Sequence, residues 1–388
     1  VRTVKLTVAV EAAAERRGDV QIKAVCLGDT ACVIDLPPEV MGYDEGPILA
    51  ASPGSGTRAP RYLILNFAHV RRINGLGASM LVKLSARTER KGQHLLAFGV
   101  HGGLRDILEI TELDRAIRIY DSEAAALVAA GLSVEQASME SGPEPSPPVD
   151  VRHWAKPVQK LELPPMPDEA RKLNVNGRGV VSPVTGFGQL WQKLYTLHIR
   201  DSSVTPKEAI AALKENFAAF QPPFNRFFAS EAGIGPGEIV LIDSSTPGGP
   251  LSTGVMVVYA DERSFTFITP QGHPECGLVS FAADEEDGEV MVQVLGLARA
   301  GDPVYEGGFR VVGAKMQVRI WTHLLRSLAA HLGVPADITV EQTCVDSRMQ
   351  WSQWGNVRHN AQIRTLMFEP VRRLRALTAR RNRGPHLV

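Results

Sequence analysis

Apolar residues in the first third of the chain fall into short runs separated by amphipathic segments. Such runs, when turn residues bound them, predict strands, here at residues 20–27, 31–36, 62–67 and 95–100. Segments with apolar residues three and four positions apart predict helices, here at about residues 76–91, 104–110 and 123–130. Strands that alternate with helices are typical of right-handed βαβ crossovers. We therefore expect a β-sheet with its helices mainly on one face.

The second half of the chain has a different order of elements. Thr205 and Glu208 form a capping box, which predicts the start of a helix that reaches about residue 220. A strand candidate precedes this helix and several follow it, at residues 194–199, 238–242, 254–259, 264–269, 277–281 and 290–297. A long amphipathic pattern then covers residues 309–332. One helix, a meander of antiparallel strands and a long helix describe the helix-grip architecture. The predicted fold class is α/β followed by α+β, with an antiparallel sheet wrapped on a long helix.

Proline-rich chain separates the two halves. Prolines are dense between Ser141 and Pro167, and proline disfavours both helix and sheet because it fixes φ and lacks an N–H donor. Trp154 and Leu161 are the side chains that we expect to hold this segment against a domain surface. The predicted division is a first domain at residues 1–135, a linker at 136–185, a second domain at 186–335, and a C-terminal helical extension with a basic tail at 336–388.

The composition excludes several classes of protein. The 388 residues include 42 basic and 42 acidic side chains, so the chain lacks the basic excess typical of a protein that binds nucleic acid through its phosphates. No apolar run reaches the length of about 18 residues that a transmembrane helix needs. Four cysteines without CxxC spacing are expected to be reduced, buried thiols. These features predict a cytoplasmic protein.

The first predicted domain carries a distinctive loop between a strand and a helix. The loop reads Arg72-Ile73-Asn74-Gly75-Leu76-Gly77, and Lys91-Gly92-Gln93 follows the helix. With these residues, the segment from 61 to 130 resembles a STAS domain, the module of anti-sigma-factor antagonists, stressosome proteins and sulfate-transporter tails. The resemblance implies a module that binds a partner protein through this loop and helix. The partner-binding candidates are Arg72, Asn74, Gly75 and Ser79.

Asn74 stands where the STAS family carries a phosphorylatable serine. Asparagine has no hydroxyl, so the family's phosphorylation switch cannot operate at this position. One interpretation is that Asn74 acts only as a helix N-cap, whose side-chain oxygen accepts a hydrogen bond from an early N–H group. The alternative is a binding surface fixed in one state.

The second predicted domain carries a Gly272-His273-Pro274-Glu275 segment before a strand. This segment and the order of elements resemble the SRPBCC superfamily of lipid-transfer, polyketide-cyclase and hydrophobic-ligand proteins, in particular a branch with the same four residues. The resemblance implies a cavity between the sheet and the long helix. A curved sheet that grips one helix cannot fill its interior with side chains, which independently favours an apolar pocket with a few polar groups.

His273 and Glu275 are the main candidates for chemistry in this pocket. Imidazole can act as an acid or a base, contact a ligand carboxylate, or bind a metal. Glu275 lies two positions further, so an extended segment places both side chains on one side. Three interpretations remain open for the pair, namely a structural turn, ligand contact, and catalysis. Arg226 and Tyr305 are further ligand-binding candidates at the pocket mouth. No zinc-ligand spacing and no nucleotide-binding glycine loop is present, so we predict neither a metal nor a cofactor.

These features support more than one function. The leading hypothesis is a cytosolic regulatory or adaptor protein, in which a STAS-like module binds a protein partner and a helix-grip module binds an apolar small molecule or lipid. The alternatives are a cyclase- or hydrolase-type enzyme and an accessory protein of lipid transport. The arginine-rich segment from Arg372 to Arg383 favours at most a weak peripheral contact with a membrane and no specific nucleic acid.

Overall fold

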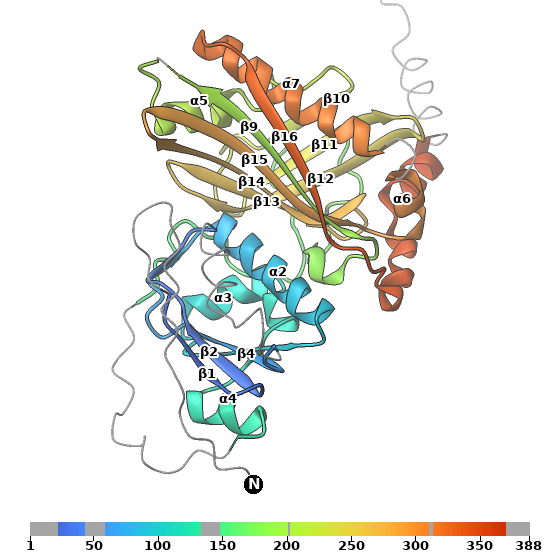
Figure 1. The fold of residues 1–388 in the computed structure, drawn as a ribbon. Coiled ribbons are helices and arrows are strands. Elements are labelled where there is room, and N and C mark those ends of the chain that lie inside the picture. The colour runs from blue at the N-terminus through green and yellow to red at the C-terminus, as the bar shows by residue number, and fades with distance from the viewer. Residues whose placement is uncertain (1–21, 43–58, 133–147, 201, 310–312, 370–388) are drawn as a thin grey trace, which may run out of the picture.

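The computed structural model describes residues 22–42, 59–132, 148–200, 202–309 and 313–369. In this part of the chain, two β-sheets and their helices are stacked in layers (Figure 1). Helix α4 lies outside the first sheet, α2 and α3 lie between the two sheets, and α5 and α7 lie beyond the second sheet. The chain therefore combines an α/β module with an α+β module, as its pattern of elements predicts.

The first module (residues 22–132) contains a five-stranded sheet in the order β1-β2-β4-β6-β7. Its strands are β1 (Ala24–Leu27), β2 (Ala31–Asp35), β4 (Tyr62–Asn66), β6 (His94–Phe98) and β7 (Arg118–Ile119). Only the β1–β2 pair is antiparallel. The helical elements are α2 (Gly75–Arg90), α3 (Gly103–Ile110), η1 (Leu113–Arg115) and α4 (Glu123–Ala129). A short parallel pair, β3 (Glu39–Val40) and β5 (Arg72–Ile73), precedes α2.

The first sheet has helices on both faces rather than on one. Helices α2 and α3 cover the face that carries Leu63, Leu65 and Ala97. Helix α4 covers the opposite face, which carries Ile64 and Leu96. The central strands are nearly continuous apolar runs, and strands of this composition are typically buried on both faces.

Cys26 and Cys32 form a disulfide, so the prediction of four reduced thiols is wrong for these two residues. They occupy directly opposite positions of the β1–β2 hairpin, which places their side chains on the same face. The disulfide follows from the register of the hairpin, and a search for CxxC spacing cannot find a pair of this kind. Cys276 is a buried free thiol, and Cys344 is a half-buried one.

The second module (residues 182–369) contains a large antiparallel sheet in the order β10-β11-β12-β13-β14-β15-β9-β16. Its strands are β9 (Leu190–Ile199), β10 (Asn225–Ala229), β11 (Ile239–Thr246), β12 (Gly249–Ala260), β13 (Ser264–Pro270), β14 (Glu275–Glu286), β15 (Glu289–Ala300) and β16 (Asp337–Asp346). Its helical elements are η3 (Pro183–Thr185), α5 (Pro206–Asn216), α6 (Pro303–Gly308), α7 (Ala314–Leu332) and η5 (Trp351–His359). Helices α5 and α7 contact each other and lie on one face, so the module has the predicted helix-grip architecture.

Strand β13 shows how both faces of the second sheet are used. Phe265 and Phe267 point toward α5 and α7 and belong to the apolar cluster inside the grip. Ile268 points the other way, into a cluster that continues into the first module. Met256 and Leu278 on the neighbouring strands lie in register with Ile268 and share that cluster. The outer face of the second sheet is therefore buried against the first module.

The segment between the modules is attached to both of them. Trp154 is buried, donates a hydrogen bond from Nε1 to the carbonyl oxygen of Ile73 (2.8 Å), and packs edge-on against Tyr259. Leu161 is also buried, so both residues hold the segment as predicted. Further along, β8 (Val180–Val181) pairs with β13. The proline-rich segment thus contributes to the contact between the modules.

The region after residue 335 does not begin as a helix, which corrects the prediction of a helical extension. Strand β16 adds to the edge of the second sheet beside β9. Residues 351–359 then form η5, and residues 361–369 are α-helical. The arginine-rich segment from Arg372 to Arg383 lies outside the described residues. Among the helices of the ranges given above, each is too short or too polar to cross a bilayer.

Candidate functional site

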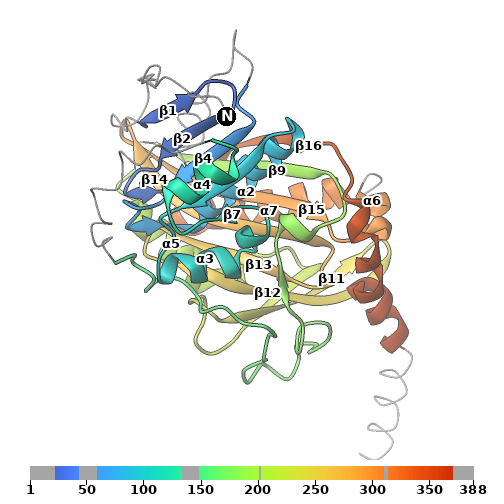
Figure 2. The same ribbon diagram turned by 90° about the horizontal axis from the view of Figure 1, so that it is seen from below.

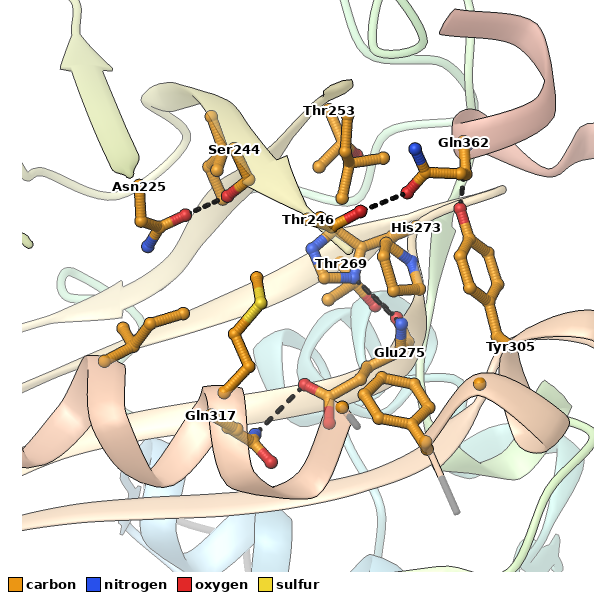
Figure 3. A pocket seen from close by; sticks show the side chains of 18 of the residues that line it. Asn225, Ser244, Thr246, Thr253, Thr269, His273, Glu275, Tyr305, Gln317 and Gln362 are labelled. Carbon is orange, nitrogen blue, oxygen red and sulfur yellow. Dashed lines mark hydrogen bonds between the residues drawn. The ribbon is translucent and has the colours of Figure 1, made fainter. Parts of the chain in front are cut away.

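A cavity of about 490 Å³ lies between the second sheet and helix α7. Its walls are mainly apolar, because alternate residues of the strands point inward and meet one face of α7. Figure 3 shows the polar side chains that interrupt these walls. The apolar lining includes Phe227, Ile242, Val255, Phe267, Ile320 and Trp321.

His273 lies in the turn between β13 and β14 and lines the cavity. The turn is closed by a hydrogen bond from the His273 N–H to the carbonyl oxygen of Pro270 (3.0 Å), and Gly272 has a φ of 93°. The Glu275 N–H donates to Nδ1 of the imidazole (3.1 Å). Burial lowers the pKa of His273 to about 4, so the ring is neutral at pH 7. His273 thus has the contacts of the structural turn and also borders the cavity.

Glu275 is the first residue of β14 and lines the same cavity. Its Oε2 accepts a hydrogen bond from Nε2 of Gln317 on α7 (3.1 Å), and Lys193 on β9 donates to the other end of that amide. Burial raises the pKa of the Glu275 carboxyl more than the charge of Lys193 and the bond from Gln317 lower it. The carboxyl of Glu275 is therefore protonated more readily than that of an exposed glutamate.

Tyr305 on α6, the other residue expected at the pocket mouth, also borders the cavity. Its hydroxyl accepts a hydrogen bond from the N–H of Gln362 (2.9 Å), and the Gln362 side chain accepts one from Thr246 (3.1 Å). Burial raises the pKa of the Tyr305 phenol. Tyr305 therefore joins α6 to the helix at residues 361–369 and keeps its proton.

Arg226 does not reach the cavity, which corrects its prediction as a ligand-binding residue. Asn225 and Phe227 on either side of it line the cavity, so alternation along β10 directs Arg226 to the opposite face. There its guanidinium lies over the ring of Phe228 and 3.9 Å from Asp243. The side chain remains more than half exposed.

Sequence reasoning missed Gln317 and Gln362, which provide two of the polar groups at this cavity. Gln317 carried a signal, because it lies four residues before Trp321 and seven before Leu324 and so falls on the buried face of α7. A polar residue within an apolar helix stripe indicates a specific partner. Gln362 carried no comparable signal.

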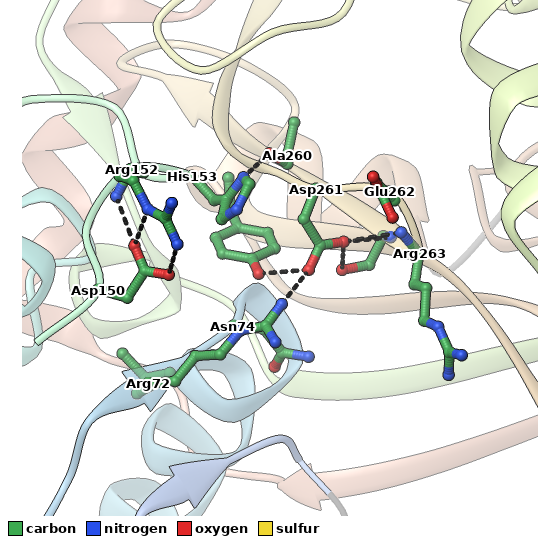
Figure 4. Close-up of polar contacts among 12 residues, drawn as sticks. Arg72, Asn74, Asp150, Arg152, His153, Ala260, Asp261, Glu262 and Arg263 are labelled. Carbon is green, nitrogen blue, oxygen red and sulfur yellow. Dashed lines mark hydrogen bonds and ion pairs between the residues drawn. The ribbon is translucent and has the colours of Figure 1, made fainter.

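Two of the four residues predicted to bind a partner protein, Arg72 and Gly75, contact the second module. Arg72 forms an ion pair with Asp261 (2.7 Å), which also accepts a hydrogen bond from Tyr259 (Figure 4). Asn74 is buried and caps α2 by accepting a bond from the Gly77 N–H (2.8 Å), as one of its two interpretations predicted. Gly75 and Ser79 are buried on the same helix.

Gly75 shows how closely the two modules approach each other. A Cβ atom at this position would lie 1.8 Å from Oγ1 of Thr266 on β13. The Ser79 hydroxyl donates to the carbonyl oxygen of Gly75 (3.0 Å) and is not available to an external partner. The face of α2 that the STAS resemblance assigns to a partner is thus covered by the chain's own second sheet.

The arrangement suits binding of an apolar molecule better than binding of a metal ion. Among the described residues, no group of three or more His, Cys, Asp or Glu side chains is placed to hold a metal. A few polar groups interrupt apolar walls, among them the Glu275–Gln317 pair and the Thr253 hydroxyl, which has no hydrogen-bond partner in the described part of the chain, and this mixture is typical of pockets for small organic molecules.

Comparison with known proteins identifies one domain family in the first part of the chain. Residues 10–126 match the family model of the STAS domain. The chain is similar to a sulfate transporter family protein from Wolinella succinogenes (20% identity, TM-score 0.25, 26% of this chain and 85% of that one). It is also similar to the major latex-like protein 151 from Panax ginseng (14% identity, TM-score 0.26, 37% of this chain and 99% of that one).

A further similar structure is the di-domain ARO/CYC StfQ from the steffimycin biosynthetic pathway (12% identity, TM-score 0.29, 37% of this chain). The chain spans 51% of that protein, about half its length. No curated protein sequence matches the chain.

Proposed function

We propose that this chain is a regulatory protein whose second module binds an apolar small molecule. The observation that carries the proposal is the cavity of about 490 Å³ between the second sheet and α7. Its volume lies in the range of pockets that enclose drug-sized ligands. Burial of apolar ligand surface against its aromatic and aliphatic walls provides the driving force for binding.

The polar groups at the cavity set the orientation of the bound molecule. Two hydrogen-bonded pairs of side chains line the cavity. Glu275 on β14 pairs with Gln317 on α7, and Asn225 on β10 pairs with Ser244 on β11. A polar group of the ligand fits beside Glu275, which lines the cavity. The remaining part of the ligand contacts the apolar side chains of the cavity walls.

The first module contributes a docking function in this proposal. STAS domains are partner-binding modules, and the face of α2 that would meet a partner is packed on β13 and β14. The second module therefore acts as the partner of the first within one chain. An external protein that binds the same face of α2 has to displace the second module. Access of such a partner therefore depends on how the two modules pack.

The proposal is tested by filling the cavity from α7. Met316 lines the cavity and Lys315 beside it is exposed, so Met316→Trp and Lys315→Trp add the same indole inside and outside the cavity. We expect Met316→Trp to reduce binding of the fluorescent apolar probe 1-anilinonaphthalene-8-sulfonate about tenfold or more, because the added ring occupies the probe's volume. Lys315→Trp is expected to leave binding unchanged.

Extraction of the purified protein with organic solvent provides the second measurement. An apolar molecule recovered in stoichiometric amount from the wild type and lost from Met316→Trp supports the proposal. Equal probe binding by both variants, with nothing recovered from the wild type, contradicts it.

A further inference from the structure

Large apolar side chains are exposed together around one end of the second module. Ile363, Leu366, Met367 and Phe368 lie on the helix at residues 361–369, and Val304 lies on α6 beside it. Both helices lie at the same end of the molecule in two perpendicular views (Figures 1 and 2). Met367 is 72% exposed, a high value for a side chain of its size. We call these five residues the apolar patch.

The apolar patch borders the mouth of the cavity. The cavity-lining residues that are exposed to solvent are Pro247, Gly248, Val304 and Gly308, so the opening lies between the β11–β12 turn and α6. Leu366 of the apolar patch lies against Gly249, the first residue of β12 after that turn, and Gln362 on the same helix lines the cavity. A surface that covers the apolar patch therefore also faces the opening.

Positive charge surrounds the base of the same helix. Arg178 donates a hydrogen bond to Nδ1 of His359 (2.8 Å) just before the helix begins. Burial lowers the pKa of the His359 imidazole, and three nearby guanidinium groups lower it further, those of Arg178, Arg358 and Arg364. The sequence from 371 to 383 contains six arginines and no acidic residue.

We propose that the apolar patch docks on an anionic lipid bilayer, with the cavity mouth facing the membrane surface. Exposed apolar side chains together with nearby guanidinium groups, here those of Arg178, Arg358 and Arg364, are the combination that holds an interfacial helix on anionic lipid. The apolar groups enter the headgroup region, and the guanidinium groups remain at the phosphates. An apolar ligand then passes between bilayer and cavity without crossing water. This inference goes beyond ligand binding itself, since the chain can fill its cavity without touching a membrane.

The test is flotation of the full chain with vesicles. We expect binding to vesicles of phosphatidylcholine with phosphatidylglycerol and much weaker binding to phosphatidylcholine alone. The double variant Met367→Asp/Phe368→Asp is expected to lose at least about tenfold in partitioning, because two apolar side chains are replaced by anions. Val128→Asp is the matched control, since Val128 on α4 is 62% exposed outside the apolar patch, and it is expected to partition like the wild type.

Two results would overturn the proposal. One is equal partitioning of the double variant and Val128→Asp. The other is the absence of vesicle binding together with a concentration-dependent dimer, measured by mass photometry, that the double variant abolishes, since the apolar patch would then be an interface between two copies. Probe binding in the cavity is measured on the same samples, so failure of membrane docking is distinguished from failure of ligand binding.

Discussion

At the scale of single residues, the most consequential contact outside the cavity is the buried ion pair of Arg299 and Asp346. The two side chains are almost fully buried, and Nη2 of Arg299 lies 2.8 Å from Oδ2 of Asp346. Arg299 also donates to the carbonyl oxygen of Gly188 (2.8 Å), and Arg348 donates to the other carboxylate oxygen (2.9 Å). Because the carboxylate compensates a buried cation, its removal costs more than the bond itself.

We therefore predict that Asp346→Asn lowers the free energy of unfolding by about 3–5 kcal/mol, since Arg299 is left without a counter-charge. Asp337→Asn on the same strand removes an exposed pair with Arg200 and is expected to cost less than about 1 kcal/mol. Urea unfolding at pH 7 measures both values. A cost for Asp346→Asn no larger than that for Asp337→Asn would contradict the prediction.

The Arg299–Asp346 pair also makes the free energy of unfolding depend on pH in the acid range. Burial raises the pKa of Asp346, but hydrogen bonds from Arg348 and Arg299 outweigh it and hold the pKa at about 2. An unfolded aspartate has a pKa of about 3.9. The stabilisation is therefore complete above pH 4 and is lost as the pH falls from about 4 to about 2. Asp346→Asn is expected to lack this part of the acid sensitivity.

At the scale of elements, the position of α2 depends on its glycines. Gly75 begins the helix against Thr266, and Gly77 lies so close to β3 that a Cβ atom would be 2.2 Å from the carbonyl oxygen of Val40. The absence of side chains at these two positions lets the helix start between two strands. A helix with alanine at either position has to move outward.

We predict that Gly75→Ala lowers the free energy of unfolding by about 1–3 kcal/mol, because the added methyl group overlaps Thr266. Gly307→Ala on α6 is the control, since a Cβ atom there would meet nothing within 4 Å. That change is expected to be neutral or slightly stabilising. Equal unfolding midpoints for both variants would show that α2 and β13 are not in close contact.

The sequence predicts most elements because their apolar period and their caps are local. Thr205 and Glu208 form the predicted capping box, and Asp287 with Gly288 closes the predicted β14–β15 hairpin with positive φ at both residues. Strand β16 could not be predicted in this way. Its residues are mostly exposed, and its pairing with β9 depends on backbone groups rather than on an apolar pattern.

The site was predictable only in part for a related reason. His273 and Glu275 belong to a short segment with a recognisable sequence, whereas the direction in which Arg226 points depends on the alternation of β10, which the sequence alone does not give. One feature of the sequence does indicate that the modules pack against each other. Residues 254–260 of β12 are almost all apolar, and a strand of this kind is buried on both faces.

At the scale of the whole molecule, one apolar cluster joins the two modules. Leu81 and Met80 of α2 belong to the same cluster as Met256, Ile268 and Leu278 of the second sheet. Trp154 adds a hydrogen bond to the first module and an aromatic contact to the second. Two modules that share a core lose its stabilisation together.

We predict that the full chain unfolds in a single calorimetric transition. Trp154→Ala is expected to lower its midpoint by several degrees or to split it, because the shared contact is weakened. Trp354→Ala, which truncates an exposed tryptophan, is expected to leave the transition unchanged. Two separate transitions in the wild type would contradict this prediction.

The buried outer face of the second sheet limits how the chain can be divided. A fragment that begins near residue 186 would expose Met256, Ile268 and Leu278 to water as one continuous apolar surface across three adjacent strands. An exposed apolar surface of this kind promotes self-association. A soluble version of the second module alone therefore requires polar residues at these three positions, while the inward-facing phenylalanines of β13 and β14 are kept.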